Sequence, residues 1–207
     1  MAPSARFWNW TARRYAKSPV ADDASYQKKL EITRGYLRPD MELLEFGCGT
    51  ASTAIVHAPH VKHIRATDIS SKMLEIARGK AANAGIGNIS FEQSSIEALE
   101  MADESVDMVL GLSILHLLED RDAIIARVHR ALQPGGLFVS STVCLGDTMK
   151  FFKWIGPIGR FLGVLPLVRV FTVAELVASM TAAGFEILHQ WQPARGKALF
   201  LIARKRT

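Results

Sequence analysis

The sequence predicts an α/β fold with a doubly wound sheet of seven strands, mostly parallel with an antiparallel edge strand. Strand patterns alternate with helical patterns along the chain, which is typical of a parallel sheet covered on both faces. A glycine-rich turn follows the first buried strand directly. The last two strands lie too close together in sequence for a helical crossover, so we expect them to pair antiparallel at one edge.

The N-terminal segment, residues 1–40, is expected to form a helical cap. Asp22 or Asp23 can cap a helix that Arg38-Pro39-Asp40 interrupts. Apolar residues recur within it at helical spacing, at Tyr26, Leu30, Thr33 and Leu37. The seven strands expected after this cap are residues 41–46, 62–68, 89–93, 106–110, 137–142, 185–191 and 198–203.

A helical stretch is expected directly after Gly47-Cys48-Gly49-Thr50, and three further helices are expected later in the chain. Ser70 or Ser71 should cap the first of them, whose inner side is expected to be Met73, Ala77, Lys80 and Ala84. The second spans residues 120–132 and stops at residues 133–136, Gln-Pro-Gly-Gly, because proline and glycine cannot continue it. The third begins at Thr172, which forms a capping box with Glu175, and runs through Ala183.

Length and composition fit one ordinary domain, residues 1–207. The chain is 49% hydrophobic and 22% charged, which excludes a disordered or collagen-like protein. Its two cysteines cannot form a disulfide scaffold, and no metal site is expected. The N-terminus lacks the uninterrupted apolar run of a signal peptide, so a cytoplasmic protein is expected. The net charge is +5, but the basic residues are scattered, so nucleic acid is not the expected partner.

Ligands of open α/β sheets bind beyond the carboxyl ends of the strands. Gly47 and Gly49 let the backbone turn sharply there and approach a ligand closely. Glu45 can attract a cation, and Asp68 can accept hydrogen bonds from two vicinal ribose hydroxyls. The candidate ligand-binding residues at this edge are Glu45, Gly47, Cys48, Gly49, Thr50, Asp68, Ser95, Ile96 and Leu112.

Five motifs resemble those of the class I S-adenosylmethionine-dependent methyltransferases of the small single-domain type. They are LLEFGCGTAS (43–52), ATDIS (66–70), DMVLGLSILHLL (107–118), LQPGG (132–136) and FTVAELVASMTAAGFE (171–186). The resemblance runs from about Met41 to Arg204. It implies a Rossmann-like fold, a methyltransferase activity and S-adenosyl-L-methionine as cofactor.

The same resemblance implies roles for individual residues. Glu45, Gly47 and Gly49 would hold the methionine end of the cofactor. Asp68 would bind the ribose hydroxyls, and Ile69 and Met73 would lie near the adenine.

The chain departs from the family pattern at two positions. Ala51 stands where a third glycine is common, and an alanine is strained there if its φ is positive. Ser95 stands where an aspartate often meets the adenine amino group, and a hydroxyl accepts that bond more weakly than a carboxylate. Both changes are expected to weaken cofactor binding without abolishing it.

Two alternative functions remain open from the sequence. A nicotinamide oxidoreductase is disfavoured, because Ser52 occupies the position of the third glycine or alanine of a dinucleotide loop. A carboxylate at Glu45 would also repel a pyrophosphate. The other alternative is a cofactor-binding or RNA-associated module of the same fold that does not turn over a small molecule.

The acceptor is expected to be a small, apolar molecule. His116, just beyond the fourth strand, is the candidate general base. The chain lacks the Asp/Asn-Pro-Pro-aromatic motif and the Pro-Cys pair of nucleic-acid methyltransferases. It also has Leu115-His116 where the ubiquinone/menaquinone-type C-methyltransferases carry Arg-Asn. The remaining histidines are expected to be surface or packing residues: His57, His60, His63, His129 and His189.

Residues 144–171 are expected to cover the substrate. The segment is rich in large apolar residues that alternate with Lys150, Lys153, Arg160 and Arg169. An acceptor pocket, a packed or dimeric face, and a peripheral membrane contact through residues 150–171 all fit this pattern. Aromatic residues near the N-terminus could close the same pocket: Phe7, Trp8, Trp10, Tyr15 and Tyr26.

Overall fold

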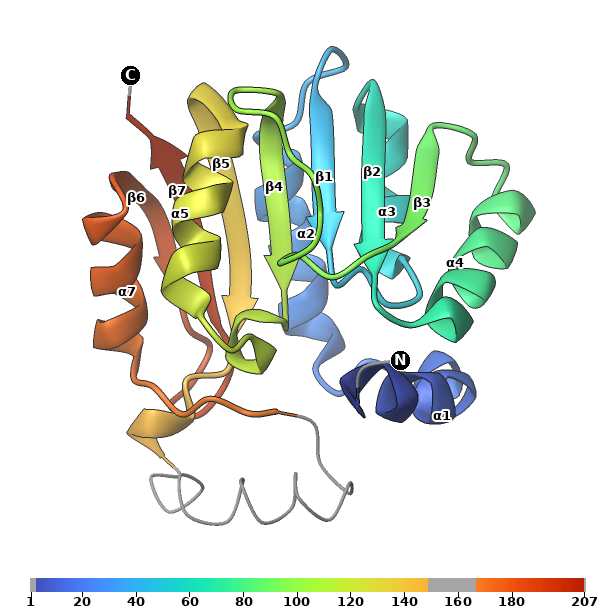
Figure 1. Cartoon of the computed structure of the whole chain (residues 1–207), viewed down its shortest axis with the longest axis horizontal. Helices are drawn as coiled ribbons and strands as arrows, with labels where there is room; N and C mark the ends of the chain where they lie inside the picture. The colour runs from blue at the N-terminus through green and yellow to red at the C-terminus, as the bar shows by residue number, and fades with distance from the viewer. Residues whose placement is uncertain (1–2, 149–166, 207) are drawn as a thin grey trace. The chain divides into compact units, whose positions relative to one another are not determined.

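The structure is a computed structural model that describes residues 3–148 and 167–206. It confirms the predicted fold class: strands and helices alternate, and seven strands form a mixed, mostly parallel sheet (Figure 1). The chain divides into two compact units, residues 1–99 and 100–207. The first contributes three strands in the order β3-β2-β1, and the second contributes four in the order β4-β5-β7-β6.

The first unit holds four α-helices, a 3₁₀ helix and three parallel strands among its described residues. They are α1 (Pro3–Lys17), α2 (Asp23–Arg34), β1 (Glu42–Phe46), α3 (Ser52–His57), η1 (Ala58–His60), β2 (His63–Asp68), α4 (Ser71–Asn83) and β3 (Ile89–Gln93). In the parallel register Phe46 pairs with Thr67, and Asp68 pairs with Gln93. The carboxyl ends of these strands therefore meet at one edge, where the glycine loop begins.

Local signals explain how the helices of this unit begin and end. The Asp22 side chain accepts a hydrogen bond from the Ser25 backbone N–H and caps α2, as predicted. The helix ends at Arg34, however, so the prediction that it extends to Leu37 is wrong. Gly35 already occupies the C-cap position, where its N–H donates to the Glu31 carbonyl.

The predicted inner face of α4 is only partly correct. Ser70 caps the helix by accepting a hydrogen bond from the Met73 N–H, and Met73 and Ala77 are buried. Lys80 instead extends to Ser52 Oγ at 2.7 Å, and Ala84 is exposed. Leu74 and Ala81 complete the buried face, because the helix is rotated slightly from the predicted register.

Helix α1 lies beside the start of α4 within the same unit (Figure 1). The Asn9 side-chain oxygen accepts hydrogen bonds from Ser70 Oγ at 2.7 Å and from the Lys72 N–H at 3.2 Å. Ala5 and Ala12 of α1 are buried. The N-terminal helix therefore has a defined contact with the cap of α4.

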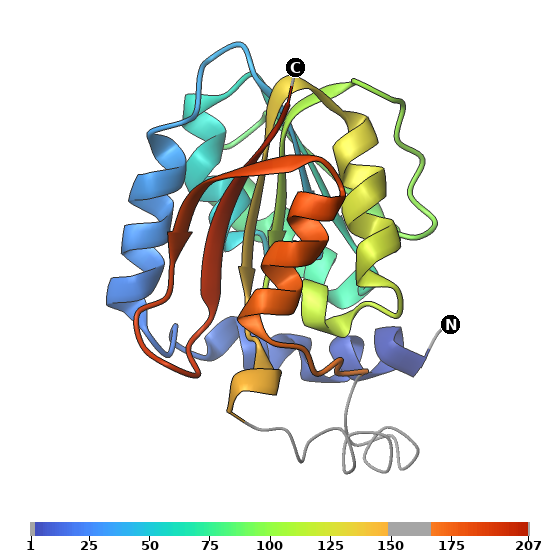
Figure 2. The same cartoon turned by 90° about the vertical axis from the view of Figure 1, so that its left-hand side faces the viewer.

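The second unit consists of four strands with helices packed against them. Its elements are β4 (Val106–Leu112), η2 (Leu115–Leu117), α5 (Arg121–Ala131), β5 (Leu132–Thr142), η3 (Leu145–Asp147), α7 (Val173–Ala182), β6 (Phe185–Trp191) and β7 (Leu199–Lys205). Strand β7 pairs antiparallel with both β5 and β6, which confirms the predicted antiparallel pairing at one edge. Figure 2 shows this antiparallel group, with α5 and α7 side by side as in Figure 1.

Strand β5 starts earlier than predicted. It begins at Leu132, immediately after α5, and takes in the Gln-Pro-Gly-Gly residues that were expected to form a separate turn. The pairing of β4 with β5 shifts register between Val106 and Met108. The extra residues are accommodated as an irregularity of the strand, with Gly135 at a φ of 78°.

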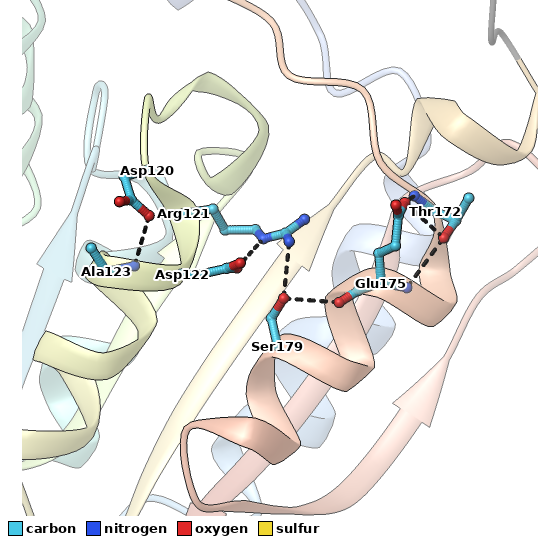
Figure 3. A network of polar contacts seen from close by, with 7 residues as sticks. All are labelled: Asp120, Arg121, Asp122, Ala123, Thr172, Glu175 and Ser179. Atoms are coloured by element: carbon cyan, nitrogen blue, oxygen red, sulfur yellow. Dashed lines mark hydrogen bonds and ion pairs between the residues drawn. The ribbon is translucent and has the colours of Figure 1, made fainter.

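A polar network joins the starts of α5 and α7 (Figure 3). The Arg121 guanidinium donates to Ser179 Oγ at 2.9 Å, pairs with Asp122, and lies 4.2 Å from the centroid of the Phe171 ring. Thr172 and Glu175 form the predicted capping box at the start of α7. Through these contacts Arg121 holds Phe171 and α7 against the start of α5.

Candidate functional site

The loop between β1 and α3 is built from left-handed backbone conformations. Gly47 and Gly49 have φ values of 63° and 55°. Ala51 has a φ of 57° and is completely buried. The strain foreseen for an alanine here is therefore present, because an L-residue with a Cβ rarely adopts this conformation. The Cys48 N–H donates to the Thr67 carbonyl at 2.9 Å and ties the loop to the end of β2.

Asp68 closes this loop from the last position of β2. Its Oδ2 accepts a hydrogen bond from the Gly49 N–H at 2.9 Å, and its Oδ1 accepts one from the Ser70 N–H at 2.8 Å. Burial raises the pKa of the Asp68 carboxyl, and hydrogen bonds from backbone N–H groups oppose that shift. The carboxyl is thereby held in a fixed orientation beside the glycine loop.

Glu45 is the most perturbed carboxyl of the site. It lies in β1, is 3% exposed, and accepts a backbone hydrogen bond from Ala54. Its second oxygen, Oε2, is buried without a hydrogen-bond partner. Burial, together with the nearby Asp68 carboxylate, raises the pKa of Glu45 to about 8. A buried carboxyl with one unused oxygen is suited to receive a cationic donor.

Two tyrosines of the N-terminal helices face this group of carboxyls. A Cβ placed on Gly49 would lie 3.8 Å from Tyr15 Cε1, so the Tyr15 ring borders the loop at ordinary contact distance. Burial and the Asp68 and Glu45 carboxylates raise the pKa of Tyr15. The Tyr26 hydroxyl lies 3.4 Å from Thr53 Oγ1, and burial raises its pKa. Both rings belong to the aromatic group that was expected to close the site.

The other predicted cofactor-binding residues in and after the loop differ from one another in burial and in hydrogen bonding. Cys48 is buried with a raised thiol pKa, and Thr50 Oγ1 lies 3.4 Å from Lys80 Nζ. The Met73 side chain is 2% exposed and therefore packs in the interior. Ile69 is half-buried, and its carbonyl accepts a hydrogen bond from Gln93 Nε2 at 3.2 Å.

Ser95 and Ile96 lie just after β3. Ser95 Oγ accepts a hydrogen bond from the Ala98 N–H at 3.3 Å, so this hydroxyl already stabilises its own turn. Ile96 is buried. A serine that caps its own turn retains acceptor capacity, because a hydroxyl has two lone pairs.

The remaining two predicted residues, Leu112 and His116, belong to the second unit. Leu112 ends β4, and His116 lies in η2. The His116 carbonyl accepts a hydrogen bond from the Arg169 N–H at 2.7 Å. Its imidazole Nδ1 is buried without a partner, and burial lowers the pKa of the ring to about 4. The imidazole is therefore neutral at physiological pH.

A family model described as a methyltransferase domain matches residues 37–195. The chain belongs to this methyltransferase-domain family. Over 110 residues it is 28% identical to an uncharacterized methyltransferase, YcgJ, of Bacillus subtilis, covering 53% of this chain and 44% of that protein. Over 113 residues it is 33% identical to the ubiquinone/menaquinone biosynthesis C-methyltransferase UbiE of Shewanella piezotolerans, covering 53% and 45% of the two chains. The chain thus spans about half the length of the curated relatives it matches.

Solved structures support the same fold. The crystal structure of the Bacillus YcgJ protein superposes with a TM-score of 0.72 at 18% identity, covering 87% of this chain and 99% of that one. An S-adenosylmethionine-dependent methyltransferase from Mesorhizobium loti superposes with a TM-score of 0.67 at 20% identity, covering 84% and 95%. Membership of the methyltransferase-domain family implies the use of S-adenosylmethionine.

The residues present fit that cofactor. S-adenosylmethionine carries an ammonium and a sulfonium and no phosphate. The unpartnered Glu45 Oε2 suits the ammonium, and Gly47 and Gly49 place no Cβ in the way of a close approach to the loop. In the parts of the chain that the structure describes, no group of three or more His, Cys, Asp or Glu side chains could hold a metal ion.

Some contacts of this methyltransferase-domain protein were not found by sequence reasoning. Asn9 connects α1 to the cap of α4, and Lys80 reaches the hydroxyls of Thr50 and Ser52. Asn9 and Ser70 are 61 positions apart, so no local pattern could reveal their contact. Lys80 was expected on the inner face of α4. Its long side chain extends along the helix to the loop instead.

Most of the expected substrate cover, residues 144–171, falls at 149–166 and lies outside the described residues. The two described ends are held together. The Gly146 N–H donates to the Phe171 carbonyl at 2.8 Å, and Asp147 Oδ2 accepts from the Val173 N–H at 2.8 Å. Within residues 3–148 and 167–206, no helix has the length and apolar character needed to cross a bilayer.

Proposed function

We propose that this chain transfers a methyl group from S-adenosyl-L-methionine to a small, apolar acceptor. The observation that carries the cofactor assignment is the buried Glu45 carboxyl with its unpartnered Oε2, placed beside the strained glycine loop and Asp68. Such an oxygen disfavours a pyrophosphate and favours an ammonium. The nicotinamide alternative therefore gains no support from this geometry.

The cofactor supplies an activated methyl group on its sulfonium, so the protein has mainly to bind and orient both reactants. Glu45 pairs with the ammonium in this proposal. Asp68 accepts from the ribose hydroxyls while the Gly49 and Ser70 N–H groups keep its carboxyl in place. The Tyr15 ring borders the loop at Gly49.

His116 is proposed to accept a proton from the acceptor. Burial lowers the pKa of its imidazole to about 4, so the ring is neutral at physiological pH and would act as a weak base. The Arg169–His116 backbone bond holds η2 in position. His116→Ala is expected to lower turnover while cofactor affinity stays unchanged. Equal turnover in the two proteins would remove His116 from the mechanism.

Support for an apolar acceptor comes from the relatives and the composition. The Shewanella relative is described as a C-methyltransferase of ubiquinone and menaquinone biosynthesis. Residues 151–171 of this chain are rich in Phe, Leu, Ile and Trp. With radiolabelled methyl donor, label should enter the chloroform-soluble fraction of a cell extract. Labelling confined to the aqueous fraction would contradict this part of the proposal.

Calorimetric titration with S-adenosylhomocysteine tests the cofactor assignment, with NAD as the comparison. At pH 7 the Glu45 carboxyl is mostly protonated, and pairing with the ammonium should ionise it. Binding should therefore release up to about one proton, measured as a difference in heat between phosphate and Tris buffers. Glu45→Gln should bind more weakly and release no proton.

Asp68→Ala should weaken binding of S-adenosylhomocysteine by about 2–3 kcal/mol, through lost hydrogen bonds to a charged acceptor. Asp68→Asn is the matched variant, because it keeps one oxygen and nearly the same shape. A thermal melt of each variant shows whether the loop remains folded. An Asp68→Ala protein that is folded and binds as tightly as the wild type would disprove the ribose contact.

A further inference from the structure

Helix α1 carries a basic face with an exposed tryptophan at its centre. Arg6 lies four residues before Trp10, Arg13 and Arg14 lie three and four residues after it, and Lys17 lies one turn further on, so the five residues share one side of the helix. All five are exposed, and Trp10 exposes 82% of its surface. The helix, Pro3–Lys17, contains no aspartate or glutamate. We refer to these five residues as the basic face.

The opposite side of α1 packs against the rest of the first unit. Ala5 is 5% exposed, Ala12 is fully buried, and Asn9 receives hydrogen bonds from Ser70 and Lys72. The orientation of the helix is thus fixed by contacts that the basic face does not make. Trp10 is not needed for packing, so its exposure requires another explanation.

The acidic neighbour that the structure places near this face is already paired. Glu75 of α4 lies near Arg13, but its carboxylate bonds Lys72 Nζ at 2.7 Å, and that bond is the main cause of its lowered pKa. The positive charge of the basic face therefore remains largely uncompensated by its surroundings. An anionic partner would complement it.

We propose that the basic face of α1 docks on an anionic phospholipid surface, with Trp10 in the headgroup layer. Tryptophan partitions to the bilayer interface, where its ring is buried and its indole N–H stays hydrated. Arginine and lysine around it bind lipid phosphates and are attracted by the surface potential of anionic lipids. A basic helix with an apolar centre and no acidic residue meets both requirements.

RNA is the competing anionic partner, and the geometry favours it less. Single-stranded nucleic acid is bound by aromatic platforms that stack successive bases along a basic groove. The basic face has one exposed ring on a convex helix, and the neighbouring Phe7 and Trp8 are half-buried and pack edge-to-face against each other. The lipid proposal does not depend on the cofactor assignment.

Vesicle flotation with the full-length protein tests the proposal. The wild type should float with vesicles of phosphatidylglycerol and phosphatidylcholine, and not with phosphatidylcholine alone. The variant R6Q/R13Q/R14Q/K17Q should lose at least about ten-fold in apparent affinity, because each basic residue adds to the attraction. The matched control K28Q/R38Q/R130Q/R206Q removes the same charge from exposed positions elsewhere and should bind as the wild type does.

Fluorescence gives an independent measure if the four-fold variant is poorly folded. In a protein whose Trp8, Trp154 and Trp191 are changed to Phe, emission from Trp10 should shift to shorter wavelength when phosphatidylglycerol vesicles are added. Trp10→Ala should weaken flotation without changing the melting temperature. Equal loss in the control variant, an unshifted spectrum, or binding to an RNA oligonucleotide but not to vesicles would each overturn the proposal.

Discussion

Replacing Glu45 by glutamine should stabilise the unliganded protein while it weakens the proposed cofactor site. The wild-type carboxyl is fully buried, accepts one backbone hydrogen bond from Ala54, and leaves Oε2 unpartnered. Glutamine has nearly the same shape and keeps a carbonyl oxygen for the Ala54 bond. It cannot ionise, so it avoids the cost of placing a charge in this environment.

The size of the effect follows from the pKa. Glu45 has a pKa of about 8 in the fold against an ordinary value of 4.5, so folding favours its protonated form. The stability that this carboxyl contributes is complete below pH 4.5 and is lost as the pH rises from 4.5 to about 8. Between these two pKa values, each pH unit lowers the free energy of unfolding by about 1.4 kcal/mol. The wild type should therefore be less stable than Glu45→Gln by about 3 kcal/mol at pH 7.

Urea unfolding of both proteins at pH 5, 6, 7 and 8 measures this difference. The gap between them should be under about 1 kcal/mol at pH 5 and should widen with each step toward pH 8. Glu97→Gln, which neutralises an exposed carboxylate between β3 and β4, serves as the control and should show no such trend. Parallel stability curves for wild type and Glu45→Gln would refute the argument that Glu45 is buried with a raised pKa.

Two further predictions concern packing. A Cβ on Gly146 would lie 2.6–2.8 Å from backbone atoms of Phe171 and Thr172, so Gly146→Ala should lower the free energy of unfolding by at least about 2 kcal/mol. Gly79→Ala is the matched control, because nothing lies within 4 Å of a Cβ there, and it should raise the free energy of unfolding by about 0.5–1 kcal/mol. Both are measured by urea unfolding, and equal effects would contradict the contact. Both ring nitrogens of buried His57 lack hydrogen-bond partners, and burial lowers the pKa of the ring to about 4. Because the fold disfavours the protonated ring, the free energy of unfolding should fall as the pH drops from 6.5 to 4. His57→Leu should be about 1–3 kcal/mol more stable at pH 7, with a larger gain at pH 5, and a less stable variant would show that a hidden partner exists.

Much of the fold could be predicted because its determinants are local. The Asp22, Ser70 and Thr172 caps, the buried β1 pattern and the short connection between β6 and β7 each depend on a few adjacent residues. The predicted ends of helices and strands were wrong where tertiary contacts determine them. The Gln-Pro-Gly-Gly residues form part of β5 because β4 offers hydrogen-bond partners on either side of the irregularity, which the sequence alone does not reveal.

The site could be predicted in outline and not in its electrostatics. The motif places Glu45 and Asp68 near the carboxyl ends of neighbouring parallel strands, and this register lets Asp68 reach the Gly49 N–H of the loop that follows β1. The pKa of about 8 at Glu45 depends on its complete burial and on its distance from the Asp68 charge, and the sequence motif shows neither. The positive φ of Ala51 likewise depends on how the loop is held against β2.

Helix α1 connects the two proposals made for this protein. Asn9 fixes it to the cap of α4 directly after Asp68, and Tyr15 borders Gly49 from the same helix. Its other side carries the basic face around exposed Trp10. A surface that binds this face would therefore act on a helix already in contact with the cofactor loop. If the acceptor is apolar, α1 is the element through which membrane docking would alter cofactor affinity, and binding of S-adenosylhomocysteine with and without phosphatidylglycerol vesicles measures that coupling.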